Sequence, residues 1–271
     1  MQIRRSIEIL VVLTLATLVI GAGEVVASTY TVDDDGPSDF STIQEAINSA
    51  ANGDVIKVKE GVYEETIDLK AKPLTIDGKG VGRTVIDASS GTGYAISNFG
   101  DNTTFKDVTL FGTKTAVTGY GFKISHVSNV ALKNVRVESS QKTGIDLNTV
   151  SGATLKNIEV FDTESGFGLM IFESSDVEVK NVKTSGNAWG GVTVQLTNDD
   201  VGPVSFGGTF EASEATPFLL EKDPPYGGKF VDVETPHKFN YVFYGKRSGD
   251  NYKHWFYKET LSQVKSLAGS I

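Results

Sequence analysis

Four short phrases decide the fold of this chain: Gly121-Phe-Lys-Ile124, Gly144-Ile-Asp-Leu147, Gly168-Leu-Met-Ile171 and Gly191-Val-Thr-Val194. Their first glycines stand 23, 24 and 23 residues apart. A second phrase keeps the same step, as Leu132-Lys-Asn-Val135, Leu155-Lys-Asn-Ile158 and Val179-Lys-Asn-Val182. Two strand-like runs per period, with no helical pattern between them, are typical of a β-solenoid, whose units bury their apolar faces by stacking on one another. The sequence therefore predicts an all-β solenoid.

The alternation of side chains along a strand predicts which residues of these phrases face the interior. The apolar positions of the first phrase should stack inside, from Phe122 and Ile124 to Val192 and Val194. The residues between them should point outward in one column, namely Lys123, Asp146, Met170 and Thr193. A second outward column should hold Ser125, Asn148, Phe172 and Gln195.

The asparagines of the second phrase, Asn134, Asn157 and Asn181, should form a column at a turn. Asn tolerates left-handed backbone angles, and stacked amides can hydrogen-bond along the solenoid axis. We therefore interpret these residues as structural.

Both ends of the solenoid should carry a helical cap, because an end exposes a cross-section of the core and unpaired strand edges. Residues 42–51 read as an amphipathic helix that Ser41 caps, with Gln44 three residues after the cap and Asn52-Gly53 at its end. Residues 258–271 read as a second helix, with Leu261, Val264 and Leu267 on one face. Between residues 204 and 244 we expect further, less regular coils.

The N-terminus resembles an export signal that ends at residue 27. Arg4 and Arg5 precede an apolar run at residues 7–20, and Val25-Val-Ala27 resembles a cleavage site. The alternative is an uncleaved anchor, since residues 7–27 are about as long as a bilayer span of ~20 residues. Cleavage leaves one β-helix domain, 28–257, and its closing helix, 258–271, in a secreted or cell-surface protein.

Charge and composition exclude several classes of partner and site. The formal net charge is −9, and no basic stripe is evident, so nucleic acid and anionic membranes should be repelled. An acidic polysaccharide should be repelled too, unless cations or a local basic patch receive it. The chain has no cysteine, which excludes disulfides and thiolate chemistry.

The N-terminal part also resembles a known family. Tyr30-Thr-Val-Asp-Asp-Asp-Gly36, Asp39-Phe-Ser-Thr-Ile-Gln-Glu-Ala-Ile47, Gly53-Asp-Val-Ile-Lys-Val58 and Gly61-Val-Tyr-Glu-Glu65 look like the opening of pectin-lyase-like right-handed parallel β-helix proteins. That group includes pectin methylesterases and exported prokaryotic repeat proteins, among them relatives of a copper-insertion accessory protein. The resemblance implies a single-stranded right-handed parallel β-helix.

The catalytic phrases of these relatives do not occur in this chain. Pectin methylesterases carry their two aspartates in Gln-Asp-Thr-Leu and Asp-Phe-Ile-Phe-Gly phrases, and neither is found here. The nearest echo of a polygalacturonase motif is Ser125-His126-Val127, which lacks the required glycine. We interpret His126 as a turn residue.

A loop edge between the phrases holds the remaining candidates for chemistry. Counting back from the repeat glycines places Glu138 and Asp162 in equivalent positions, with Glu164 and Lys142 nearby. Two carboxylates about 5 Å apart suit a retaining glycosidase. The same three carboxylates could instead hold calcium, and calcium with Lys142 or Arg136 as base would suit β-elimination. The plainest alternative is a solvated loop edge.

The outward columns are the other candidate site, this time for recognition. Sugars stack on aromatic faces, and Phe172 and Trp189 are the aromatic residues least easily buried. We expect an extended polysaccharide, or a cell-envelope glycan, to contact Lys123, Asp146, Asn148, Met170, Phe172, Trp189 and Gln195. Binding without catalysis is our leading interpretation. The alternatives are a polysaccharide lyase or glycoside hydrolase and a structural envelope component.

Overall fold

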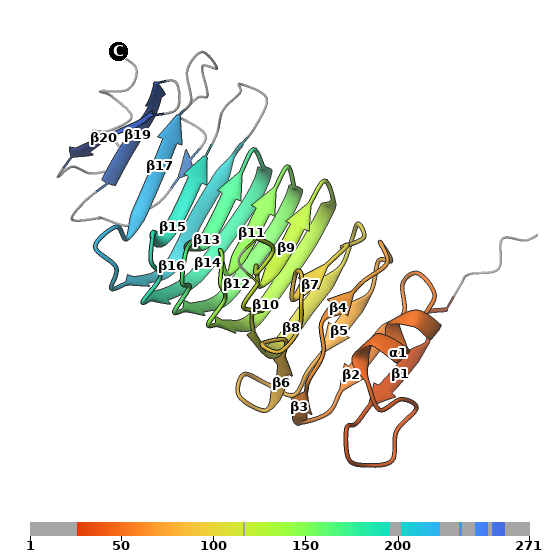
Figure 1. The fold of residues 1–271 in the computed structure, drawn as a ribbon. Coiled ribbons are helices and arrows are strands. Elements are labelled where there is room, and N and C mark those ends of the chain that lie inside the picture. The colour runs from red at the N-terminus through yellow and green to blue at the C-terminus, as the bar shows by residue number, and fades with distance from the viewer. Residues whose placement is uncertain are drawn as a thin grey trace, which may run out of the picture.

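The computed structural model describes residues 26–115, 117–195, 202–222, 233–234, 242–248 and 251–257, with side chains up to residue 220. These residues form an elongated solenoid (Figure 1). Its N-terminal end carries the helix α1 (Ile43–Ser49), and β19 and β20 lie at the other end. The predicted all-β parallel solenoid is confirmed.

Two sheets form the walls of the solenoid, and within each sheet nearly all pairings are parallel. We call the sheet that begins with β1 sheet A and the other one sheet B. Sheet A holds β1 (Thr29–Val32), β2 (Val55–Val58), β3 (Gly61–Tyr63), β5 (Thr75–Asp77), β6 (Thr84–Asp87), β8 (Thr104–Phe111), β10 (Ser128–Glu138), β12 (Ser151–Phe161), β14 (Ser175–Ser185), β16 (Val204–Ala212) and β18 (Val233–Glu234). Sheet B holds β4 (Ile67–Asp68), β7 (Ile96–Ser97), β9 (Phe122–Ser125), β11 (Ile145–Asn148), β13 (Phe167–Phe172), β15 (Gly190–Gln195), β17 (Phe218–Lys222), β19 (Val242–Ser248) and β20 (Asn251–Tyr257).

The repeat sets the register of the strands, as its period predicts. In sheet A, Leu132 pairs with Leu155, which pairs with Val179. In sheet B, Ile145 lies between Phe122 and Leu169. Each coil therefore places one strand of each phrase directly against the same strand of the next coil.

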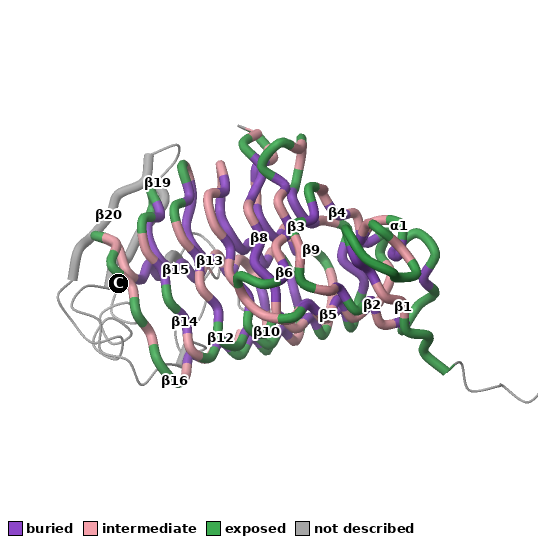
Figure 2. Tube along the Cα trace, turned by 90° about the horizontal axis from the view of Figure 1, so that it is seen from below, coloured by how far each residue is buried: buried purple, intermediate pink, exposed green. Residues whose placement is uncertain are grey.

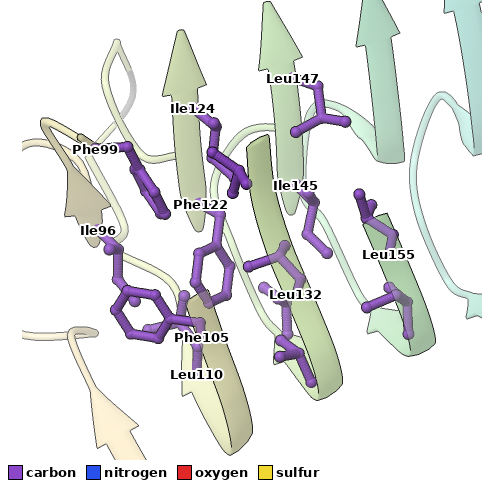
Figure 3. Packing of buried hydrophobic residues seen from close by; sticks show 14 of the residues in the cluster. Ile96, Phe99, Phe105, Leu110, Phe122, Ile124, Leu132, Ile145, Leu147 and Leu155 are labelled. Atoms are coloured by element: carbon purple, nitrogen blue, oxygen red, sulfur yellow. The ribbon is translucent and has the colours of Figure 1, made fainter. Parts of the chain in front are cut away.

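The interior between the two sheets is one continuous apolar core. Phe105 and Phe122 pack edge to face from opposite sheets, with ring centroids 5.4 Å apart (Figure 3). Leu132, Leu155 and Leu147 are fully buried along the same core. Burial of this apolar surface is the main favourable term in the free energy of folding.

The N-terminal cap differs in detail from its prediction. The helix is confirmed, but Thr42 and not Ser41 is its N-cap, and the Glu45 amide donates to Thr42 Oγ1 at 3.2 Å. The helix ends at Ser49 with Ala50 as C-cap, before Asn52-Gly53. Gln44 forms no capping box, because its side chain hydrogen-bonds the backbone of Asp68 on β4. The cap is thus fastened to the first coil of sheet B.

The predicted asparagine column is confirmed. Asn134, Asn157 and Asn181 have φ angles of 52°, 56° and 59°. Asn157 Nδ2 donates to Asn134 Oδ1 at 2.6 Å, and Asn181 Nδ2 donates to Asn157 Oδ1 at 2.7 Å. Asn134 in turn donates to Asp107 at 2.8 Å. Each long strand of sheet A bends at this column, and the amide ladder holds the bends in line.

Beyond residue 195 the coils are less regular, as expected. β16 pairs with β14 with a register shift, and β17 continues sheet B. The last pairing, β19 with β20, is antiparallel. Residues 1–25 of the expected export signal and the expected closing helix at 258–271 lie outside the described residues. Within the described part of the chain, no helix has the length and apolar character needed to cross a membrane.

Candidate functional site

The outer face of sheet B carries the two predicted columns in the predicted register. Lys123, Asp146, Met170 and Thr193 stand side by side on β9, β11, β13 and β15. Ser125, Asn148, Phe172 and Gln195 form the second column on the same strands. Buried and partly exposed residues alternate along β9, as a two-residue period requires, whereas β15 is buried at every position except its last (Figure 2).

The first column is less accessible than predicted. Asp146 and Thr193 are both fully buried, although their side chains leave the core face of the sheet. Asp146 makes a very short ion pair with Lys123, which is only slightly exposed. Among the described residues, Asp146 Oδ1 and Thr193 Oγ1 find no hydrogen-bond partner. The expectation that Asp146 lies open to a ligand is therefore wrong, because neighbouring side chains cover this part of the strand face.

Burial also raises the pKa values of Asp146 and of the neighbouring Tyr120. Loss of hydration raises the pKa of Asp146, while the hydrogen bond and charge of Lys123 oppose the rise. Burial likewise raises the pKa of Tyr120, and the nearby Asp146 carboxylate adds to this rise. Lys123 Nζ lies 4.9 Å from the centroid of the Tyr120 ring, a cation–π distance. Asp146 thus holds the Lys123 ammonium beside an aromatic ring.

A groove opens on sheet B next to this cluster, on its N-terminal side. It has a volume of about 670 Å³, and its lining includes Asp68, Tyr94, Ser97, Lys123, Ser125 and His126. Tyr94 lies beside Tyr120 with ring centroids 5.9 Å apart, and Tyr94 is 36% exposed. An aromatic wall, a cation and several hydroxyl groups therefore meet in one concave surface, which we call the sheet B groove.

Sequence reasoning missed the two tyrosines. Both immediately precede the first-phrase positions, as Tyr94-Ala-Ile96 and Tyr120-Gly-Phe122. Each tyrosine stands two residues before the first inward-facing residue of its strand, and both lie on the outer side of sheet B. This shared position is the sequence feature from which they could have been predicted. His126 is an exposed turn residue with φ of 56°, as predicted, and it also lines the groove.

A second aromatic pair lies farther along the same face. Trp189 is 57% exposed and packs edge to face on Phe167, with centroids 5.9 Å apart. Phe167 itself is buried against Leu219. Phe172, Met170, Asn148 and Gln195 are all half-buried. β7 and β15, which bound the stretch from Tyr94 to Trp189, are four strand spacings apart, or about 19 Å.

The predicted pairing of Glu138 with Asp162 is wrong by one residue. Glu138 pairs with Phe161, and Asp162 follows the strand in the turn. The repeat step changes from 23 to 24 residues because the extra residue lies in this turn, after Asp162. The inserted residue lies between Asp162 and Gly168, so counting back six residues from the repeat glycines gives Glu138 the wrong partner. Ser139 and Asp162, both with φ of 57°, are the equivalent turn residues.

Two of the three carboxylates of this turn edge pair with different cations. Glu138 lies 3.6 Å from Arg136, and Glu164 pairs with Lys114 at 2.6 Å. The Lys114 ammonium lowers the pKa of Glu164. Asp162 is exposed and Lys142 is half-buried. This dispersal fits a solvated edge better than a catalytic pair, and calcium binding by Glu138, Asp162 and Glu164 stays a prediction.

The described residues bring one other group of carboxylates together, Asp33, Asp34 and Asp35, whose oxygens lie within 4.8 Å of one another. Asp33 is committed to Lys59, whose Nζ lies 2.7 Å away and lowers the pKa of Asp33. Asp34 accepts a hydrogen bond from the Val62 amide. The loop therefore serves to tie the cap segment to β3.

Comparison with known proteins supports the architecture. Residues 84–210 match the family model described as right handed beta helix region. A stretch of 90 residues is 38% identical to a probable pectinesterase/pectinesterase inhibitor of Arabidopsis thaliana, covering 32% of this chain and 16% of that relative. Pectinesterase 2 of Citrus sinensis is 34% identical over 94 residues, 30% of this chain and 18% of that protein. The predicted resemblance to pectin-lyase-like β-helix proteins is confirmed.

The matches to these curated relatives cover less than a quarter of the relatives' own length. Among solved structures, the A-module of a mannuronan C-5 epimerase of Azotobacter vinelandii aligns with a TM-score of 0.48 and 15% identity, over 66% of this chain and 57% of that one. Pectin methylesterase from carrot aligns with a TM-score of 0.40 and 15% identity, over 82% of each chain.

Proposed function

We propose that this right-handed parallel β-helix protein is exported and binds an extended polysaccharide in the sheet B groove. The observation that carries the proposal is Tyr94, which lines a groove that also presents Lys123, with Tyr120 packed beside both of these residues. Sugar rings offer C–H groups to aromatic faces and hydroxyl groups to polar side chains, and the groove provides both kinds of surface. Resemblance to pectinesterases supports a carbohydrate ligand.

In this proposal the buried pair orients the groove rather than contacting the ligand directly. Asp146 is covered, so it acts through Lys123, which it fixes beside Tyr120. A buried carboxylate that is paired in this way limits the rotamers of a long flexible lysine and so lowers the entropy lost on binding. Asp146 is therefore a positioning residue for the groove.

The test is a glycan array probed with the protein, with and without calcium, followed by titration calorimetry on any polysaccharide that binds. Tyr94→Ala should weaken binding roughly twofold to tenfold, since an aromatic contact contributes roughly 0.5–1.5 kcal/mol. Val62→Ala is the matched control, because Val62 is 52% exposed but lies on β3 in sheet A. Equal affinity of Tyr94→Ala and wild type would exclude the groove as the binding site.

The reach of the ligand along the solenoid can be measured with the same assay. If the polysaccharide extends over the roughly 19 Å to the second aromatic pair, Trp189→Ala and Phe172→Ala should each weaken its binding, with little change in the melting temperature. If only Tyr94→Ala has an effect, the bound segment is confined to the N-terminal coils.

One observation favours a second candidate, a polysaccharide-active enzyme. Clusters of ionisable groups with shifted pKa values are enriched at active sites, and Asp146 and Tyr120 both have raised pKa values beside Lys123. A product assay on each polysaccharide that binds tests this candidate. If turnover occurs, Asp146→Asn should lower the turnover rate more than it weakens binding, and release of no product from any bound polysaccharide would exclude the candidate.

A further inference from the structure

The outer face of sheet A carries a row of lysines, although the net charge of the chain is −9. Lys106, Lys133, Lys156 and Lys180 stand on β8, β10, β12 and β14 in direct register. Each follows the apolar residue of the second phrase and precedes the turn residue of the Asn column. We call these four residues the lysine row. The expectation that no basic stripe offsets the acidic surface is therefore wrong, because the stripe runs across the coils and not along the sequence.

The lysine row is not explained by stability. Like charges directly opposite on neighbouring strands destabilise a sheet. In the part of the chain that the structure describes, only the ends of the row are compensated, by Asp77 at 2.9 Å from Lys106 and by Glu178 at 3.7 Å from Lys180. For Lys133 and Lys156, the described residues offer no carboxylate within ion-pair distance. Both are exposed, in a chain with 34 acidic residues.

The surroundings of the row leave it open to a long ligand. The next outward position on β10 and β12 is occupied by Ala131 and Thr154, which are too short to overhang the lysines. On the other side lie the amides of Asn134 and Asn157, which are exposed and aligned by their ladder. A linear molecule can therefore lie along the solenoid axis over the ammonium groups, with amide groups at its flank.

We propose that the lysine row binds a linear polyanionic polysaccharide, carboxylated or sulfated, whose chain follows the solenoid axis. The strands space the lysines at about 4.8 Å, a step close to the length of one sugar unit, so a polymer with one negative charge per sugar can meet successive ammonium groups. This site lies on the opposite sheet from the sheet B groove and is independent of it. It would hold the protein on an anionic glycan while the groove stays free.

The same surface suits nucleic acid less well. Single-stranded nucleic acids are held by basic grooves in which bases stack on aromatic side chains. No aromatic residue stands in the outward positions next to Lys133 and Lys156, where Ala131, Thr154, Asn134 and Asn157 are found.

The experiment measures binding of the full-length protein to polygalacturonate, dextran sulfate, uncharged dextran and a single-stranded polynucleotide, each at two salt concentrations. The wild type should bind at least one of the two anionic polysaccharides and bind less at high salt, because ions screen exposed charges. Lys133→Gln/Lys156→Gln should weaken this binding roughly fivefold to tenfold, and Lys133→Arg/Lys156→Arg should retain it. Which of the two polymers binds better distinguishes carboxylate from sulfate recognition.

Lys114→Gln is the matched control for a single lost charge, to be compared with Lys133→Gln and Lys156→Gln separately. Lys114 is exposed and lies in a turn away from the row. An equal loss in Lys114→Gln would show general attraction to positive charge and overturn the proposal, as would an unchanged affinity in the double variant. Stronger binding to the polynucleotide than to either polysaccharide would also overturn it. Tyr94→Ala should leave this binding intact, so failure of the groove and failure of the row are separable.

Discussion

The two sheets share one repeat, yet their outer faces differ. Sheet A is built from strands of 11 residues in β10, β12 and β14, bent at the Asn column, and its outward side chains stand open in rows. Sheet B is built from shorter strands, 4 residues in β9 and β11, and side chains cover part of its face. The repeat fixes which residues stand in line on both faces, whereas the turns decide which of them meet solvent.

The largest expected effect tests the interior that both faces share. Leu155→Ala should lower the free energy of unfolding by about 2–5 kcal/mol, because Leu155 is fully buried between Leu132 and Val179 and truncation leaves a cavity. Denaturant unfolding measures the change. The neighbouring Lys156→Ala, on the outer face, should change it by less than about 0.5 kcal/mol. Similar losses in both variants would mean that the inner and outer faces have been misassigned.

The next effect tests what keeps the open face of sheet A in order. Asn157→Ala should cost about 1–3 kcal/mol, because Asn157 has φ of 56° and makes two amide ladder bonds. Asn157→Gly separates the two causes, since glycine adopts the left-handed angle freely. Thermal unfolding of the two variants should therefore show a smaller loss for glycine. Equal losses would assign the whole effect to the ladder and none to the backbone.

The sequence predicted most of what depends on period. The register of Leu132 on Leu155, the Asn column and both outward columns of sheet B follow from a step of 23 or 24 residues and from alternation along a strand. These features follow from the same sequence pattern in every coil, so the agreement between successive coils supports each prediction. The helical cap was also predictable from its apolar stripe, although its exact N-cap depended on the contact between Gln44 and β4.

What the sequence did not predict depends on turns and on neighbours across coils. A single inserted residue after Asp162 shifted its partner from Glu138 to Ser139. The burial of Asp146 depends on side chains packed over the strand face, such as Lys123 and Tyr120, which no period reveals. The lysine row escaped notice because its members are isolated along the chain and adjacent only in the stacked structure.

A smaller effect concerns the covered face of sheet B and its dependence on pH. Asp146 has a pKa raised above the 3.8 of a free side chain, so the folded state binds its proton more tightly than the unfolded state. Its contribution to stability is therefore fully present below pH 3.8 and is lost as the pH rises through the raised pKa. The amide group that replaces this carboxyl in Asp146→Asn does not titrate. The stability of Asp146→Asn relative to wild type should thus increase as the pH rises through this window.

Unfolding curves of both proteins between roughly pH 3.5 and pH 7, chosen to span the range above a free carboxyl pKa, measure this difference. A difference that stays constant with pH would show that the Lys123 ammonium balances burial, and a difference that decreases as the pH rises would show that it outweighs burial. The same measurements on Lys123→Gln serve as a control, since removal of the opposing charge should steepen the dependence on pH.

The smallest effect lies at the turn edge between the sheets. Glu138→Gln and Asp162→Asn should each change the free energy of unfolding by less than about 0.5 kcal/mol, because the two side chains are partly or fully exposed and lie in different register positions. Asn is also accepted at the φ of 57° that Asp162 adopts. Calcium should raise the melting temperature of wild type no more than that of either variant. If calcium stabilises wild type and either substitution removes that gain, the ion draws the two carboxylates together, and this edge is a metal site in spite of its register.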